Sequence, residues 1–292
     1  MITIFAMTER GFKVISEIIK EFGSSFIELV ISAKDENIKN DYFKEIEELC
    51  RENNIVFTDR KSNFEIKTEF IFAIGWKWLI KLEDDRKLIV FHDSLLPKYR
   101  GFAPLVNSLI NGEKEIGVTA LFASEEYDKG DVIFQSKTTI EYPIKIEKAI
   151  ELNNENYVRS ALYISKLVKQ EKSIQAKSQN ELEATYSLWR NEEDYKINWN
   201  ESAIQIKRFI DATGTPYKGA FTMVENEKIR ILDAEVVQDL KIMPRDFGKV
   251  IFVDKGNPII VCASGLLKIT MAFNEDKMTN FLPLKKFRIR LQ

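Results

Sequence analysis

The strongest constraint on the fold is an alternation of short apolar runs with segments of helical spacing. Runs suited to buried strands occupy residues 2–7, 26–31, 55–57, 69–74, 88–91, 117–122 and 132–135. Apolar residues at helical spacing occupy residues 11–22, 42–50, 103–110 and 144–168. Strands that alternate with helices are typical of parallel sheets, because parallel neighbours need a crossover connection. The sequence therefore predicts an α/β domain with a doubly wound, mostly parallel sheet.

A different pattern follows in the last third of the chain. A helix is expected from Ser202, and short strands are expected at 228–231, 248–253, 258–262 and 266–271. Short strands separated by turn residues are typical of a small barrel. A chain of 292 residues is also too long for one typical domain. We expect a first domain over residues 1–184, a linker over 185–202 and a C-terminal domain over 203–292.

The composition excludes several classes of protein. No apolar run approaches 18 residues, and the N-terminus turns polar too early for a signal peptide. Cys50 and Cys262 lack metal-ligand spacing, so we interpret them as reduced thiols of a cytoplasmic protein with no membrane partner. The net charge of −2 and the sequence pI of about 5.8 show no basic footprint for a nucleic-acid partner.

Two common phosphate-binding motifs are absent from the sequence. The first apolar run is followed by Thr8-Glu9-Arg10-Gly11, which lacks the G-x-G-x-x-G spacing. A G-x-x-x-x-G-K-[ST] loop is missing as well. Dinucleotide and P-loop chemistry are therefore disfavoured.

Residues 87–104 contain the best candidates for chemistry. The apolar run 88–91 ends in His92-Asp93-Ser94, and a loop follows that contains Pro97, Lys98, Arg100 and Gly101. Ligands of open α/β sheets bind beyond the carboxyl ends of the strands, so polar residues placed there are functional candidates. Because the sequence contains 1 His, any imidazole chemistry falls to His92.

The run His92-Asp93-Ser94-Leu95-Leu96-Pro97-Lys98-Tyr99-Arg100-Gly101 resembles the signature of the N10-formyltetrahydrofolate-dependent formyltransferases. Gly117-Val118-Thr119 and Tyr127-Asp128-Lys129-Gly130-Asp131 match further family segments, and Asp128 follows His92 at the family's spacing of 36 residues. The resemblance is strong over 87–135 and weaker after 185. It implies a formyltransferase domain followed by an OB-like barrel, with N10-formyltetrahydrofolate as the co-substrate.

The resemblance also implies roles for individual residues. His92 and Asp128 are the expected catalytic pair, with His92 as a base or oxyanion donor and Asp128 fixing its tautomer. The expected supporting loop comprises Val90, Ser94, Pro97, Arg100 and Gly101. The expected folate-binding residues are Ile74, Gly75, Trp76 and Asp131. No metal site is expected.

Val90 departs from the family pattern, which has Asn at this position. Side chains alternate along a strand, so the family's Asn and His lie together over the formyl group. Losing one oxyanion donor costs on the order of 10²–10³ in rate. Two alternatives follow: an active enzyme in which another group replaces the Asn, or a non-catalytic relative that binds folate or a sugar nucleotide.

The sequence leaves the acceptor amine open. The near-neutral charge and the two-domain organisation favour the family members that formylate nucleotide-linked amino-dideoxy sugars for surface glycans. A 4-amino intermediate on a pseudaminic-acid-like route is one candidate. Methionyl-tRNA formyltransferase is the alternative, which salt-dependent tRNA binding would support. A homodimer is expected from the resemblance alone.

Overall fold

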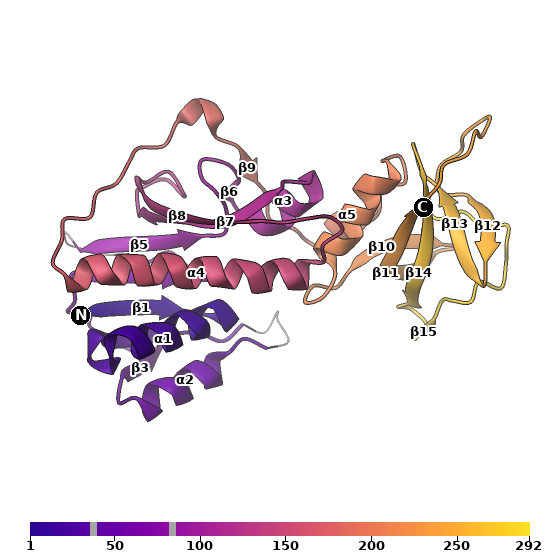
Figure 1. Cartoon of the computed structure of the whole chain (residues 1–292). Coiled ribbons are helices and arrows are strands. Elements are labelled where there is room, and N and C mark those ends of the chain that lie inside the picture. Colours follow the sequence, from indigo (N-terminus) through magenta and orange to yellow (C-terminus); the bar gives the residue numbers. More distant parts are fainter. Residues whose placement is uncertain (36–39, 82–85) are drawn as a thin grey trace. The chain divides into compact units, whose positions relative to one another are not determined.

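The structure is a computed structural model that describes residues 1–35, 40–81 and 86–292. The described chain divides into two compact units (Figure 1). The first comprises Met1–Leu105, Glu115–Thr139 and Ile150–Leu188, and the second comprises Val106–Lys114, Ile140–Ala149 and Trp189–Gln292. Among the described residues, no helix has the length and apolar character needed to cross a bilayer. The domain bounds expected from the sequence stay a prediction.

A seven-stranded sheet forms the first unit, in the order β3-β2-β1-β4-β5-β7-β8. Its strands are β1 (Ile2–Ala6), β2 (Ile27–Ser32), β3 (Val56–Asp59), β4 (Phe70–Ile74), β5 (Lys87–His92), β7 (Glu115–Phe122) and β8 (Val132–Thr139). The strands β1 to β5 are parallel, and β7 and β8 are antiparallel at one edge. The mostly parallel sheet is therefore confirmed. The strand order reverses between β1 and β4, which makes this the topological switch point of the sheet.

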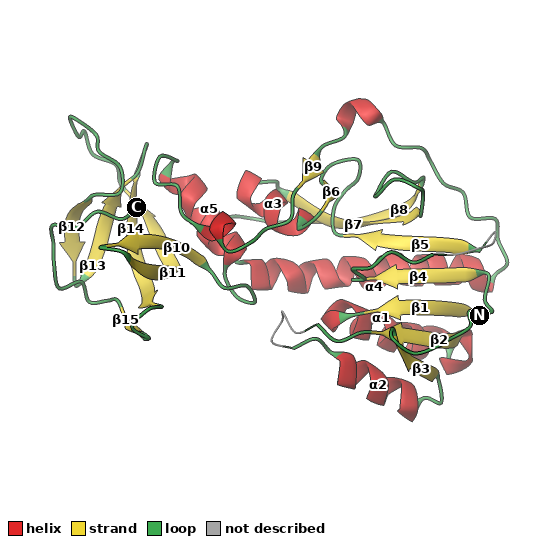
Figure 2. Ribbon diagram, turned by 180° about the vertical axis from the view of Figure 1, so that it is seen from behind, coloured by secondary structure: helices red, strands yellow, loops and turns green. Residues whose placement is uncertain are grey.

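The first four α-helices along the chain are α1 (Thr8–Phe22), α2 (Phe43–Glu52), α3 (Pro104–Asn111) and α4 (Ile146–Lys169). Helices α1 and α2 and most of α4 belong to the first unit, whereas most of α3 belongs to the second. Alternate strand residues such as Ile4 and Phe72 share one core with Ile15 of α1 and Ile164 of α4. In Figure 2 these two helices lie behind the strands. The other face of the sheet is covered by irregular chain, where Ile66 and Trp76 pack against Phe5 and Ile71. The polar segments that follow the strands are thereby left at the carboxyl edge.

A small second sheet includes part of the loop that follows β5. It pairs β6 (Arg100–Gly101) in parallel with β9 (Tyr186–Ser187). Residues 177–187, here called the strap, contain β9 and begin where Lys177 exchanges two backbone hydrogen bonds of 2.8 Å with Val132 of β8. Neither short strand could be predicted from periodicity, because each contains only two residues.

The second unit packs a helix on an antiparallel sheet. The helix α5 (Ala203–Thr213) begins with a capping box in which Ser202 and Gln205 bind each other's backbone amide. The strands are β10 (Ala220–Val224), β11 (Glu227–Val237), β12 (Val250–Asp254), β13 (Asn257–Val261), β14 (Leu266–Asn274) and β15 (Thr279–Asn280). Their order is β10-β11-β14-β13-β12, and β15 pairs with β14. The strand β10 was not predicted.

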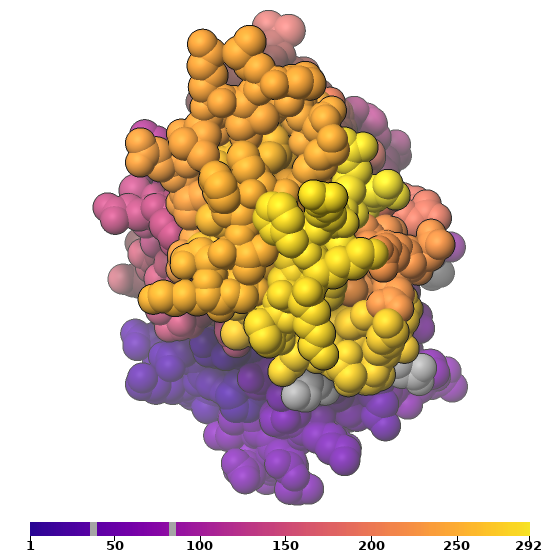
Figure 3. Space-filling view, turned by 90° about the vertical axis from the view of Figure 1, so that its right-hand side faces the viewer, coloured from indigo at the N-terminus to yellow at the C-terminus, as the bar shows by residue number. Residues whose placement is uncertain are grey.

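The C-terminal residues connect the two ends of this sheet. Gln292 exchanges backbone hydrogen bonds of 2.8 and 2.9 Å with Met223 of β10, and the amide of Leu291 donates to Gly248, just before β12, at 2.8 Å. The segment 289–292 therefore closes the path from β10 to β12, as a barrel requires. Figure 3 shows the face of this unit that its C-terminal strands build, coloured orange to yellow. The OB-like topology itself stays a prediction.

Candidate active site

His92 ends the interior strand β5, and its imidazole lies between two oxygen acceptors. The side chain is only 8% exposed. Nε2 lies 2.9 Å from the carbonyl oxygen of Tyr99, and Nδ1 lies 3.3 Å from Oδ1 of Asp128. A carbonyl only accepts, so Nε2 carries a proton. Nδ1 faces the carboxylate closely enough for a proton to pass between the two groups. His92 and Asp128 therefore form a pair that can take up and release a proton.

Asp128 lies in the turn between β7 and β8 and binds two segments of chain. Its backbone is in the left-handed region, with φ of 58°. While Oδ1 faces His92, Oδ2 accepts a hydrogen bond of 2.8 Å from the backbone amide of Gly101. The loop after β5 thus contacts both members of the pair, through the carbonyl of Tyr99 and the amide of Gly101.

The expected loop residues hold the backbone in shape. Ser94 is buried, and its hydroxyl donates to the carbonyl of Lys98 at 2.6 Å. Pro97 follows a cis peptide bond, and its carbonyl accepts from the amide of Thr185 in the strap. Gly101 has φ of 101°, and a Cβ there would lie 2.6 Å from the carbonyl oxygen of Ser187. A larger residue would separate the loop from the strap.

Arg100 is buried, being 1% exposed, and contacts the strap instead of solvent. Its Nη1 and Nη2 donate to the two carboxylate oxygens of Glu181 at 2.9 and 2.7 Å, and its Nε donates to Oε1 of Gln179 at 3.1 Å. Hydrogen bonding by Glu181 raises the pKa of Arg100, and the same contact lowers the pKa of Glu181. These contacts hold the loop after β5 against the strap.

Val90 lies in an apolar row on the His92 side of β5. It is half-buried, and its partners across the neighbouring strands are Ala73 of β4 and Leu121 of β7. His92 pairs with Thr119, whose hydroxyl donates to the carbonyl of Ser94 at 2.6 Å. The strand positions adjoining Val90 therefore supply no side-chain donor in place of the family's Asn.

Three of the expected folate residues lie at the carboxyl end of β4, at the switch point: Ile74 ends the strand, and Gly75 and Trp76 follow it. Ile74 is fully buried, and its carbonyl accepts from the amide of Met7 at 3.1 Å. Gly75 turns the chain with φ of 62°, and a Cβ there would meet the carbonyl oxygen of Met7 at 3.0 Å. The ring of Trp76 packs edge-on against Phe5 at 4.9 Å, and its buried Nε1 has no hydrogen-bond partner among the described residues. Most buried donors in proteins have a hydrogen-bond partner, so this unpaired Nε1 is a candidate contact for a polar ligand.

Asp131, the fourth expected folate residue, is exposed beyond the turn that carries Asp128. Its backbone carbonyl accepts from the amide of Phe122 at 3.0 Å, which closes the turn between β7 and β8. The contacts that join His92, Asp128 and the loop after β5 do not include the Asp131 carboxylate.

The sequence reasoning missed a polar cluster on the opposite side of β5. Asp93 forms an ion pair with Arg10, and its other oxygen accepts from Asn153 at 3.2 Å. Arg10 also donates to the hydroxyl of Tyr157 at 3.1 Å. Burial alone would lower the pKa of Arg10, but Asp93 raises it above its usual value. Burial, followed by Asp93, raises the pKa of Tyr157.

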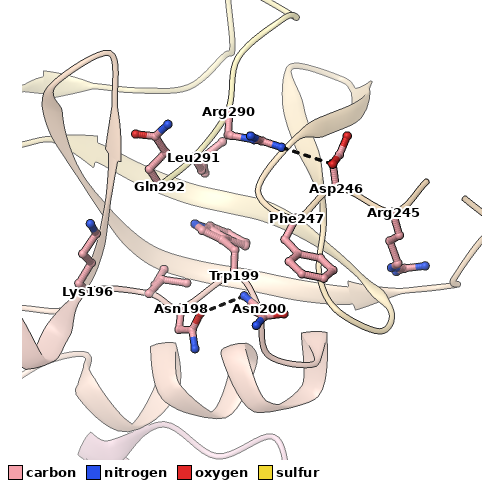
Figure 4. A pocket seen from close by; sticks show the side chains of 11 residues that line it. Lys196, Asn198, Trp199, Asn200, Arg245, Asp246, Phe247, Arg290, Leu291 and Gln292 are labelled. Atoms are coloured by element: carbon pink, nitrogen blue, oxygen red, sulfur yellow. Dashed lines mark hydrogen bonds and ion pairs between the residues drawn. The ribbon is translucent and has the colours of Figure 1, made fainter. Parts of the chain in front are cut away.

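Two of the hollows on the described surface bear on the position of the site. One of about 620 Å³ adjoins the Asp128 turn and is lined by Ser124, Glu125, Glu126, Lys129 and Glu181. The other, of about 600 Å³, lies on the second unit, where Figure 4 shows Trp199, Phe247 and Arg290 around it. Of these two, the first contains Lys129, the chain neighbour of the expected catalytic Asp128. The described residues contain no group of three His, Cys, Asp or Glu side chains that could hold a metal ion.

Comparisons with known proteins identify the family. Residues 61–156 match the family model described as formyl transferase, and residues 190–281 match that of the formyl transferase C-terminal domain. The methionyl-tRNA formyltransferase of Finegoldia magna is 30% identical over 261 residues, which cover 84% of this chain and 82% of the relative. The chain therefore belongs to the formyltransferase family, an enzyme family whose formyl donor is N10-formyltetrahydrofolate.

Other relatives match over different extents. The methionyl-tRNA formyltransferase of Alkaliphilus oremlandii is 34% identical over 181 residues, but the match spans little more than half of that protein, at 56% of its length. A solved structure of an N-formyltransferase from Helicobacter canadensis, with folinic acid and dTDP-3-aminofucose, is similar with a TM-score of 0.67 and 20% identity. That likeness covers 93% of this chain and 99% of the other, and it shows a shared fold.

Proposed function

We propose that this chain transfers a formyl group from N10-formyltetrahydrofolate to the amine of a nucleotide-linked amino-dideoxy sugar. The observation that carries the proposal is the approach of His92 Nδ1 to Asp128 Oδ1 at 3.3 Å, beyond the carboxyl end of an interior strand. A buried imidazole beside a carboxylate is suited to proton transfer during acyl transfer.

The reaction needs a proton acceptor and an oxyanion donor. A neutral amine attacks the formyl carbon, its nitrogen loses a proton, and the bond from the formyl carbon to folate N10 breaks. The His92–Asp128 pair takes the proton from the amine and returns one to the departing nitrogen of tetrahydrofolate. Because Asp128 is held by the amide of Gly101, the pair keeps its geometry through both steps.

Oxyanion stabilisation is the weaker part of this site. Val90 has no donor, and the strand positions adjoining it are apolar, as described above. A preorganised donor supplies on the order of 10²–10³ in rate. The chain is therefore proposed as an active but slow member of its family.

The donor is proposed to bind at the switch point between β1 and β4. Its pterin would lie against the chain leaving β4, where Gly75 permits a close backbone approach. The unpaired Nε1 of Trp76 offers one hydrogen bond to a polar group of the ligand. This placement puts the donor beyond the same edge of the sheet as His92.

Two observations favour different acceptors. A net charge of −2 supports a small nucleotide sugar, because tRNA binding depends on neutralising many phosphates. The 30% identity to the Finegoldia magna protein over 82% of its length favours methionyl-tRNA as the second candidate. A cytoplasmic site of action and a role in surface glycan synthesis belong to the first proposal.

An acceptor panel tests the proposal. Release of tetrahydrofolate is followed with N10-formyltetrahydrofolate and either nucleotide-linked amino sugars or methionine-charged initiator tRNA. Turnover with an amino sugar alone is the expected result. Turnover with charged tRNA alone would transfer the assignment to the second candidate. Folate binding without turnover on any acceptor would indicate a non-catalytic relative.

A further inference from the structure

We propose that Gln179, in the strap, is a positioning residue that fixes Asp128 relative to His92. Its amide side chain connects the guanidinium of Arg100 to the turn that carries Asp128. The inference rests on the proposed formyl transfer for its kinetic effect, but the geometry that it assigns can be measured without turnover.

The amide of Gln179 has partners on both of its ends. Its Oε1 accepts from Nε and Nη2 of Arg100 at 3.1 and 2.9 Å. Its Nε2 donates to the carbonyl oxygens of Asp128 and Gly130 at 2.7 and 2.8 Å. All the hydrogen-bonding positions of the amide are therefore used. The opposite orientation would place NH₂ against a guanidinium and oxygen against two carbonyls, so the orientation is fixed by chemistry.

Arg100 provides a rigid anchor for this amide. It is buried and bound through two oxygens by Glu181, and such a paired contact restricts the guanidinium plane. The residue that follows Arg100, Gly101, donates its backbone amide to Oδ2 of Asp128. Asp128 is thus held at its carboxylate by Gly101 and at its carbonyl by Gln179. The chain from Arg100 to Gly101, the bond from Gly101 to Asp128, and the bonds of Gln179 to Asp128 and Arg100 together form a closed ring.

The turn needs this support because its backbone conformation is unfavourable. Asp128 has φ of 58°, in the left-handed region that L-residues occupy only when the surrounding structure holds them there. Gly130 is packed so closely that a Cβ would lie 1.7 Å from the carbonyl oxygen of Phe122. Gln179 binds the carbonyls on both sides of Lys129. Without it, both carbonyls lose their partner and the Asp128 backbone can relax.

Gln179 is expected to affect the reaction rate only through the position of Asp128. Gln179→Leu should lower kcat on the order of 10- to 100-fold with little change in KM for the donor, since misplacing a reacting group by about 1 Å has such a cost. In an Asp128→Asn background the same substitution should cause little further loss, because the group it positions is already altered. Gln175→Leu is the matched control, since Gln175 lies just before the strap, is exposed, and binds Ser173 through its Nε2.

A second readout uses the fact that the chain contains 1 His. The ring ¹⁵N signals of that residue need no assignment and report the contact between Nδ1 and Asp128 directly. At one pH, Asp128→Asn should move these signals from their wild-type positions. Gln179→Leu should move them in the same direction, and Gln175→Leu should leave them in place. Gln179→Glu replaces the Leu variant if that variant does not fold. It keeps an oxygen acceptor for Arg100 but turns its second oxygen toward the two carbonyls, so it should move the ring signals in the same direction.

The outcomes separate this inference from the proposed function. Wild-type ring signals in the Gln179 variants, or rate losses that add fully to those of Asp128→Asn, would overturn the positioning role. If the wild-type protein transfers no formyl group to any acceptor, the proposed function fails. The ring signals still decide whether Gln179 fixes the pair.

Discussion

Nδ1 of His92 lies 3.3 Å from Oδ1 of Asp128, although His92 ends β5 and Asp128 lies in the turn between β7 and β8. The contact depends on one short loop, because Tyr99 binds the other nitrogen of His92 and Gly101 binds the other oxygen of Asp128. The site can therefore be altered at three separate points: the pair, the loop that holds it, and the missing donor at Val90.

Val90→Asn tests the missing donor. The substitution places an amide on the His92 side of β5, and it should raise kcat by up to about 10²-fold if an oxyanion donor is lacking. Val90→Leu is the control for volume, and it should not increase the rate. Unchanged turnover in Val90→Asn would show that another group already provides the donor.

Gly101→Ala tests the close approach of the loop to the strap. A Cβ would meet the carbonyl oxygen of Ser187 at 2.6 Å, and the residue has φ of 101°. Both effects should lower the free energy of unfolding, by about 2–4 kcal/mol. Gly23→Ala is a matched control, because Gly23 has φ of 85° but no atom within 4 Å of its Cβ position. Urea denaturation measures the free energy of unfolding of both variants. Equal decreases in Gly101→Ala and Gly23→Ala would contradict a steric cost at Gly101.

The ion pair between Asp93 and Arg10 should contribute to stability more than a surface pair does. The side chains are 17% and 18% exposed, so removing one carboxylate leaves a largely buried guanidinium. Asp93→Ala should cost about 3 kcal/mol, at the low end for a buried pair because some solvent remains. Glu17→Ala, from the exposed pair with Lys20, should cost under about 1 kcal/mol. A similar small loss for both variants would be evidence against the importance of this cluster.

The two buried thiols should make the protein less stable at alkaline pH. Burial raises the pKa of Cys50 and of Cys262 to about 12 in the folded chain. A thiol in the unfolded chain has a pKa of about 8.5. Between these values the unfolded state binds fewer protons, so its free energy falls relative to the folded state as pH rises. Each thiol should lower the free energy of unfolding by about 1.4 kcal/mol per pH unit in this window. Cys50→Ala should reduce the slope of unfolding free energy between pH 9 and 11, and an unchanged slope would exclude this cause.

The sequence predicted the strands whose residues form continuous apolar runs. The apolar runs that became β1 (Ile2–Ala6) and β4 (Phe70–Ile74) need a buried sheet, and their bounds were expected to within a residue or so. The strand β10 (Ala220–Val224) was missed because it follows a turn-rich segment without clear alternation.

The residues of the candidate site were likewise predicted only in part. The family motifs suggested His92 and Asp128, and the spacing between them is visible in the sequence. Gln179 could not be found, because its role depends on bonds to residues 79 and 51 positions away in the chain. No periodicity or motif encodes such contacts, which appear only when the turn, the loop and the strap are placed in space.

The rate of tetrahydrofolate release in Asp128→Asn tests the central claim most directly. The assay uses N10-formyltetrahydrofolate and the acceptor that supports turnover in the panel. Asp254→Asn provides a control, since Asp254 is an exposed carboxylate paired with Lys268 in the second unit. We expect the wild-type rate in Asp254→Asn and a loss of at least about 10²-fold in Asp128→Asn. A wild-type kcat in Asp128→Asn would contradict the assignment of His92 and Asp128 as the catalytic pair.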